Sequence, residues 1–210
     1  MATPRSQQIG IWVIAVTLTI GTLGSFLAMI LGSQNQATDQ ARLKKMDSEY
    51  RIKVSTQTKA LSDKYYGEFS QYATIPTTFN AADVKELVKT DLKIGDGAEI
   101  KSGTPYSAYY IGWNPKGVIF DQSIKNGALI APILGGEFIT GWNEGIIGMR
   151  FGGIRELTIP SDKAYGSTAS SADIPANTPL KFIIMIIPKV TDVPMPAELL
   201  EYYQSQSAGA

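Results

Sequence analysis

Hydrophobic and polar residues follow three different patterns along this chain of 210 residues. Residues 9–31 carry no charged side chain, whereas residues 33–72 are polar with apolar side chains three, four and seven positions apart. From about residue 84 to residue 190, short apolar runs are separated by glycine and proline. These patterns predict, in order, a helix able to cross a bilayer, an amphipathic helix and a domain rich in strands.

The uncharged run at residues 9–31 is the candidate membrane anchor. As a helix it would span roughly 35 Å, enough for a bilayer core of about 30 Å. A cleaved signal peptide is the main alternative, although its apolar stretch is usually shorter and ends at a small-residue cleavage site; a buried soluble helix is the other. The charges on the two flanks do not decide the orientation. We expect a lipid-embedded single span, with residues 1–8 as a cytoplasmic tail and the larger domain outside the cytoplasm.

Residues 32–78 form the expected helical stalk and linker. Glycine and proline are absent from residues 34–66, and the apolar side chains recur at helical spacing. A solvated spacer and a stalk that packs on the domain both fit this pattern. The apolar stripe is too interrupted for a coiled coil, but a homodimer through the stalk or the membrane helix remains open, because small residues lie four apart in the span.

Residues 79–193 carry the strand pattern and are the expected folded domain, followed by a tail with a short helix at residues 194–210. We predict one short helix at residues 139–149. Many strands with one short helix indicate an α+β fold built on an antiparallel sheet. The clearest predicted strands are residues 106–113, 118–122, 155–159 and 180–187.

Composition limits the chemistry that the domain can perform. The chain contains no cysteine and no histidine, which excludes disulfides, a thiolate nucleophile, a Ser-His-Asp triad and the usual zinc sites. Its 19 basic residues balance its 19 acidic residues, so no basic surface for nucleic acid is indicated. We therefore expect no metal, no cofactor and no nucleic-acid partner.

A series of segments in this domain resembles the FKBP family of peptidyl-prolyl cis-trans isomerases, in the family's order and at near-family spacing. The resemblance implies a sheet wrapped around the short helix and catalysed rotation about X-Pro bonds of proline-containing polypeptides. Each segment is weak support alone, whereas the ordered set is a strong indication. The segments are LKIGDG at 92–97, AYYIG at 108–112, GVIFDQS at 117–123, EFITGWNEG at 137–145, LTIP at 157–160 with AYG at 164–166, IP at 174–175 and LKF at 180–182.

Such an isomerase needs neither an acid–base pair nor a nucleophile. Rotation about the peptide bond breaks no covalent bond but faces a barrier of roughly 18–20 kcal/mol. The twisted amide has a less polar carbonyl than the planar one, so a dry, rigid pocket binds it preferentially. Lowering the barrier by about 6 kcal/mol would accelerate the step roughly 10⁴-fold.

The resemblance assigns a role to each expected pocket residue. Trp142 would be the platform for the proline ring, Tyr165 would donate its hydroxyl to a substrate carbonyl, and Asp121 would be a polar acceptor at the edge. The residues whose ring edges would surround the twisted carbonyl are Tyr110, Phe120 and Phe182. The residues that would complete the substrate-binding walls are Phe138, Ile139 with its backbone N–H, Ile130 and Ile174. Ile130 is a departure, because many family members have phenylalanine there.

Two other functions remain open from the sequence. The domain could hold proline-containing segments without catalysis, as a chaperone or adaptor. The chain could also be a structural membrane protein in which the stalk assembles a complex. Joint retention of Tyr110, Asp121, Trp142 and Tyr165 favours catalysis, because a simple binder would not need all four.

The last predicted strand is apolar on both faces. Alternation sends Phe182, Ile184 and Ile186 to the pocket side and the intervening residues 183, 185 and 187 to the outer face. An exposed outer face would normally be polar, so we expect a cover from residues 61–69, with the tail helix at residues 196–203 as the second candidate. Partial shielding by long neighbouring side chains is the third interpretation.

Overall fold

The computed structural model describes the backbone of residues 5–207 and the side chains of residues 37–206. The chain divides into two compact units, one formed by residues 1–53 with 194–210 and the other by residues 54–193. Among the described residues, no helix combines the length and the apolar character needed to cross a membrane. The expected span at residues 9–31 lies outside the residues whose side chains are described.

The first unit joins part of the long helix α1 (Arg5–Phe69) to the C-terminal helix α3 (Ala197–Ser207). The hydroxyl of Tyr203 donates a hydrogen bond of 2.7 Å to Asp47, and Arg51 donates one of 2.8 Å to the same carboxylate. These two bonds, with Tyr203 as the larger cause, lower the pKa of the exposed Asp47. Arg42 forms a further ion pair with Glu198.

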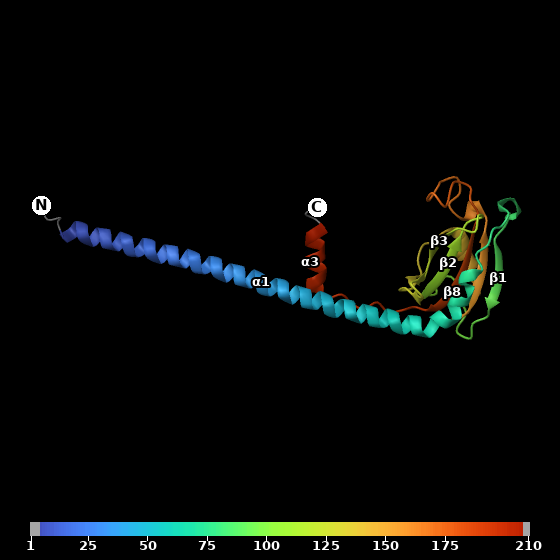
Figure 1. The fold of residues 1–210 in the computed structure, drawn as a ribbon, viewed down its shortest axis with the longest axis horizontal. Coiled ribbons are helices and arrows are strands. Elements are labelled where there is room, and N and C mark those ends of the chain that lie inside the picture. Colours follow the sequence, from blue (N-terminus) through green and yellow to red (C-terminus); the bar gives the residue numbers. More distant parts are fainter. Residues whose placement is uncertain (1–4, 208–210) are drawn as a thin grey trace. The chain divides into compact units, whose positions relative to one another are not determined.

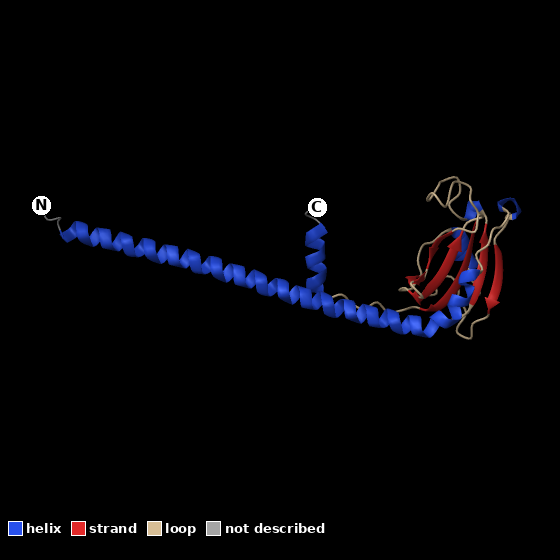
Figure 2. Ribbon diagram, viewed as in Figure 1, coloured by secondary structure: helices blue, strands red, loops and turns tan. Residues whose placement is uncertain are grey.

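The second unit is an antiparallel sheet with the strand order β1-β7-β8-β2-β3, and a short strand β6 pairs with β2. Figure 1 labels β1, β8, β2 and β3 of this sheet. Figure 2 shows its strands and the loops that join them. The strands are β1 (Val88–Lys93), β2 (Tyr106–Trp113), β3 (Ile119–Gln122), β4 (Ile124–Lys125), β5 (Ala128–Leu129), β6 (Ile133–Leu134), β7 (Ile154–Ile159) and β8 (Leu180–Pro188). The helical segments are η1 (Ser70–Thr74), η2 (Ala81–Asp83), α2 (Thr140–Gly145) and η3 (Ser161–Lys163). This architecture is the α+β fold expected from the sequence.

The short helix is shorter than the sequence predicted. We expected residues 139–149, but α2 ends at Gly145, and Gly148 adopts a positive φ of 82°. The Gly148 N–H donates to Ile100 O at 3.0 Å, so the chain leaves the helix to meet the segment that precedes β2. Glycine takes this backbone conformation without the steric penalty that other residues incur.

The central strands β2 and β8 are buried on both faces, which explains their nearly continuous apolar sequence. One face of β8 contributes Phe182, Ile184 and Ile186 to a core that also contains Trp142. The other face contributes Ile183, Met185 and Ile187 to a second core, and none of these three is more than 1% exposed. The two cores lie on opposite sides of a single sheet, as the alternation of β8 requires.

The outer face of the sheet is covered by the last turns of α1 and the segment that follows. Phe69 is fully buried in this second core, and Tyr65 and Tyr66 pack against it. Ser62 accepts a hydrogen bond of 2.9 Å from Leu129 N–H and fixes the helix to β5. The expected cover from residues 61–69 is therefore confirmed, although Leu61 itself is only partly buried. The interpretation that long neighbouring side chains alone shield this face is wrong.

Candidate active site

An aromatic pocket of about 470 Å³ lies on the other side of the sheet. Trp142, in the first turns of α2, is 3% exposed and lies beneath it. Its ring meets Tyr110 at 5.6 Å and 84° and Phe182 at 5.4 Å and 82°, both edge-on, whereas Phe138 lies 5.2 Å away and tilted. Phe120 meets Phe182 edge-on at 5.6 Å. These rings line a largely apolar space, and the edge of an aromatic ring carries partial positive charge.

Two glycines allow α2 to lie close to strand β7. A Cβ added to Gly141 would lie 2.3 Å from Ile159, and one added to Gly145 would lie 2.4 Å from Leu157. The two positions are four residues apart and so share one face of the helix. The glycines of the segment GWNEG thus bring the Trp142 platform against the sheet.

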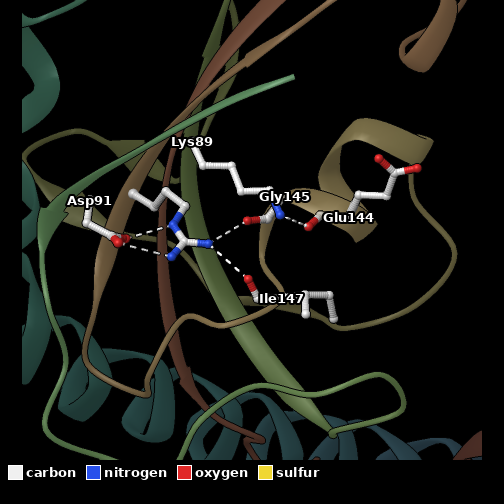
Figure 3. A network of polar contacts seen from close by, with 6 residues as sticks. Lys89, Asp91, Glu144, Gly145 and Ile147 are labelled. Carbon is white, nitrogen blue, oxygen red and sulfur yellow. Dashed lines mark hydrogen bonds and ion pairs between the residues drawn. The ribbon is translucent and has the colours of Figure 1, made fainter. Parts of the chain in front are cut away.

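The C-terminal end of α2 is held by two cationic side chains, the buried Arg155 and the exposed Lys89 (Figure 3). Arg155, only 6% exposed, donates to Gly145 O at 2.8 Å and to Ile147 O at 3.1 Å. Its other nitrogens bind the Asp91 carboxylate at 2.7 and 3.1 Å, and Lys89 donates to the carbonyl of Glu144. Carbonyls at a helix end lack partners within the helix and attract cations. This network therefore fixes the helix that carries Trp142.

Tyr110 and Asp121 form a hydrogen-bonded pair at the edge of the pocket. The Tyr110 hydroxyl donates to one carboxylate oxygen, and the other oxygen accepts the Gln122 N–H at 2.8 Å. Burial first, and the Asp121 carboxylate second, raise the pKa of Tyr110 well above its ordinary value. The hydroxyl is thus a fixed donor at neutral pH, and Asp121 orients it.

Two further donors border the pocket. Within the part of the chain that the structure describes, neither the Tyr165 hydroxyl nor the Ile139 N–H makes a hydrogen bond. Both residues line the pocket, and Tyr165 is 42% exposed. Both groups are thus available to a bound carbonyl.

The structure brings together all but one of the site residues expected from the sequence. Ile130 is the exception, because it follows the β4–β5 hairpin, donates its N–H to Ser123 O at 2.9 Å and leaves its side chain 43% exposed. The expected residues that line the pocket are Tyr110, Phe120, Asp121, Phe138, Ile139, Trp142, Tyr165, Ile174 and Phe182. Sequence reasoning missed the lining residues Ile133, Glu137 and Ser171. Glu137 begins the EFITGWNEG segment, which was the available signal.

Comparison with known proteins agrees with this geometry. The family model described as FKBP-type peptidyl-prolyl cis-trans isomerase matches residues 97–187. The FK506-binding protein of Neisseria meningitidis serogroup A is 37% identical over 102 residues, which cover 48% of this chain and 94% of that protein. The FK506-binding protein 4 of Rhizopus delemar is 41% identical over 102 residues, 48% of this chain but 26% of that protein. The chain therefore spans about a quarter of the length of that fungal relative.

A solved peptidyl-prolyl cis-trans isomerase from Pseudomonas syringae is 30% identical, with a TM-score of 0.43 and coverage of 62% of this chain and 93% of that one. The fold and the site define the class of the protein, an α+β domain with an aromatic binding pocket above a short helix. The match to 94% of the Neisseria protein, at 37% identity, identifies the family within that class. This chain belongs to the FKBP-type peptidyl-prolyl cis-trans isomerase family.

Proposed function

We propose that this protein accelerates cis-trans isomerisation of X-Pro bonds in folding polypeptides. The observation that carries the proposal is the aromatic pocket, in which Trp142 lies beneath edge-on rings and two unpaired donors border the space. A proline ring on the indole would place its preceding amide among those ring edges. Rotation breaks no covalent bond, so the proposed step needs neither a nucleophile nor an acid–base pair.

Some pocket residues bind the proline and its neighbouring carbonyls, and others stabilise the twisted amide. Trp142 supplies a flat apolar surface for the proline ring, and Tyr165 and the Ile139 N–H hold client carbonyls by hydrogen bonds. Tyr110, Phe120 and Phe182 surround the rotating carbonyl with ring edges. Because the twisted carbonyl is less polar than the planar one, this dry environment binds the transition state more tightly than the ground state.

Isomerisation assays on the full chain test this function directly. Trp142→Ala should lower kcat/KM more than Tyr165→Phe, because it removes the platform rather than a single hydrogen bond. Tyr72→Phe is a matched control, since Tyr72 packs in the second core away from the pocket. Peptide binding without turnover would instead identify a non-catalytic proline-binding module and would contradict the proposal.

We also infer that residues 9–31 anchor the protein in a membrane and that the catalytic domain lies outside the cytoplasm. The uncharged run of this length supports the inference. Retention in the membrane fraction after alkaline carbonate washing, with the original N-terminus, is the expected result. A mature protein that begins after the run would identify a signal peptide, and protection from external protease would reverse the orientation. Cross-linking in the same membranes tests for pairing with a second copy.

A further inference from the structure

A second depression, the flanking groove, lies next to the aromatic pocket. It has a volume of about 470 Å³, and Glu137 lines both hollows. A hydrogen bond also connects their walls, because Trp142, which lines the pocket, donates to Tyr106, which lines the groove. The flanking groove is therefore adjacent to the proposed proline site.

Two chain segments that line the flanking groove, residues 101–104 and the chain around Gly135, are held by local hydrogen bonds. In the first segment, Lys101 N–H donates to the Thr104 hydroxyl and Thr104 N–H returns a bond to Lys101 O, both at 3.0 Å. In the second segment, Gly135 N–H donates to Tyr106 O at 2.9 Å, and a Cβ on Gly135 would lie 2.6 Å from the Tyr106 ring. The groove is thus formed by the fold itself.

The groove offers the contacts that an extended polypeptide uses. The backbone N–H groups of Gly136 and Glu137 make no hydrogen bond among the described residues, and a polypeptide presents one carbonyl per residue. Ile147, 40% exposed, provides an apolar surface in the same groove. Lys101 and Glu137 contribute one charge of each sign, so the lining does not favour a phosphate or another strongly charged ligand.

We propose that the flanking groove binds the residues of the client polypeptide that flank the proline held in the aromatic pocket. The protein then recognises a longer segment than the X-Pro pair. This inference rests on the proposed function, because the same client occupies both sites. Binding energy from the flanking residues can then increase catalytic efficiency at the rotating bond.

Peptides of different length with one X-Pro core test the proposal. The tetrapeptide Ala-Leu-Pro-Phe is compared with peptides that extend it by uncharged residues on either the N-terminal or the C-terminal side. Cis-trans exchange is measured by NMR with catalytic amounts of the full chain. We expect at least one extended peptide to have a kcat/KM about fivefold or more above that of the tetrapeptide.

Two variants test whether the higher kcat/KM of the extended peptides comes from the groove. A side chain on Gly136 meets nothing within 4 Å, so Gly136→Phe should fill the groove, and Ile147→Ala removes its apolar surface. Each should reduce the gain and leave tetrapeptide turnover unchanged. Gly67→Phe is the matched control, because that glycine of α1 is equally open. Equal kcat/KM for all peptides, or a gain that persists in both groove variants, would overturn the proposal.

Failure of the proposed activity would be recognised separately. If no peptide is isomerised, that function is wrong, and fluorescence anisotropy of the same labelled peptides tests the groove. Tighter binding of an extended peptide to the unmodified protein than to Gly136→Phe would support the groove. Equal affinity for both proteins would exclude it.

Discussion

The indole N–H of Trp142 donates a hydrogen bond of 3.1 Å to the hydroxyl of Tyr106, and both side chains are buried. A buried indole N–H needs a partner, because water is not there to replace one. Tyr106 begins β2, so the bond connects the platform of the aromatic pocket to the central sheet. Burial also raises the pKa of Tyr106, which keeps its hydroxyl neutral.

We therefore expect Tyr106→Phe to lower the free energy of unfolding by about 1–3 kcal/mol, because the indole N–H loses its partner. The catalytic efficiency should fall, and the Trp142 indole resonance of ¹⁵N-tryptophan-labelled protein should shift. Tyr72→Phe is the control and should change none of these. An unchanged indole resonance would show that the bond is absent in solution.

Arg155 provides a second test of how the platform is held. Arg155→Met leaves the buried Gly145 carbonyl and the partly buried Ile147 carbonyl without this donor and should lower the free energy of unfolding by about 1–3 kcal/mol in urea titrations. Asp91→Asn should cost less, because Arg155 keeps its bonds to Gly145 and Ile147. Equal losses in the two variants would locate the stabilisation in the ion pair instead.

Tyr110 and Asp121 should behave as one unit in catalysis. Tyr110→Phe and Asp121→Asn should each lower kcat/KM, and the double variant should be little worse than Tyr110→Phe because both changes remove one shared bond. Since the pKa of Tyr110 is raised, its hydroxyl should add no titration to kcat/KM up to about pH 9. Complete loss of activity in folded Asp121→Ala would contradict the binding-and-twisting mechanism.

Phe69→Ala tests the cover on the outer face of the sheet. Removing a fully buried ring should lower the free energy of unfolding by about 3–5 kcal/mol. The activity of the remaining folded protein should change little, because the pocket is on the other face. Gln71→Ala, an exposed change nearby, is the control, and a similarly small effect of Phe69→Ala would show that the cover does not stabilise the domain.

Tyr109 lies in the same covered core, and its hydroxyl has no hydrogen-bond partner among the described residues. Burial, with a smaller contribution from Tyr65, raises the pKa of Tyr109 to about 12. In the unfolded chain the Tyr109 hydroxyl loses its proton near pH 10, whereas in the folded domain it keeps the proton until about pH 12. The free energy of unfolding is therefore unaffected by this group below pH 10 and decreases as the pH rises from 10 toward 12. Tyr109→Phe should leave the free energy of unfolding at pH 7 unchanged or raise it. The decrease in the free energy of unfolding between about pH 10 and 12 should be smaller in this variant than in the unmodified protein. Urea titrations across this range are the measurement, and identical alkaline curves would contradict it.

Much of the fold could be predicted because it depends on local pattern. The strand at residues 180–187 is recognisable from its apolar run, and its two apolar faces correctly predicted a cover that includes Phe69. The end of α2 could not be placed, because its carbonyls are bound by Arg155 and the chain beyond it by Ile100, contacts between residues distant in sequence.

The pocket residues were predicted from ordered motifs, whereas the exceptions depend on loop geometry. Ile130 was aligned with the pocket but follows a turn in which Asn126 and Gly127 have positive φ, and its side chain is exposed. Ile133 lines the pocket instead, because β6 returns to pair with β2. The Tyr106–Trp142 bond joins residues that no sequence motif connects.

The cover by α1 is confined to one face of the domain's sheet. The last turns of α1 pack on the face opposite the aromatic pocket, and among the described residues none of α1 lines that pocket. A proline-containing segment bound as we propose would therefore reach the pocket without displacing the helix that stabilises the domain.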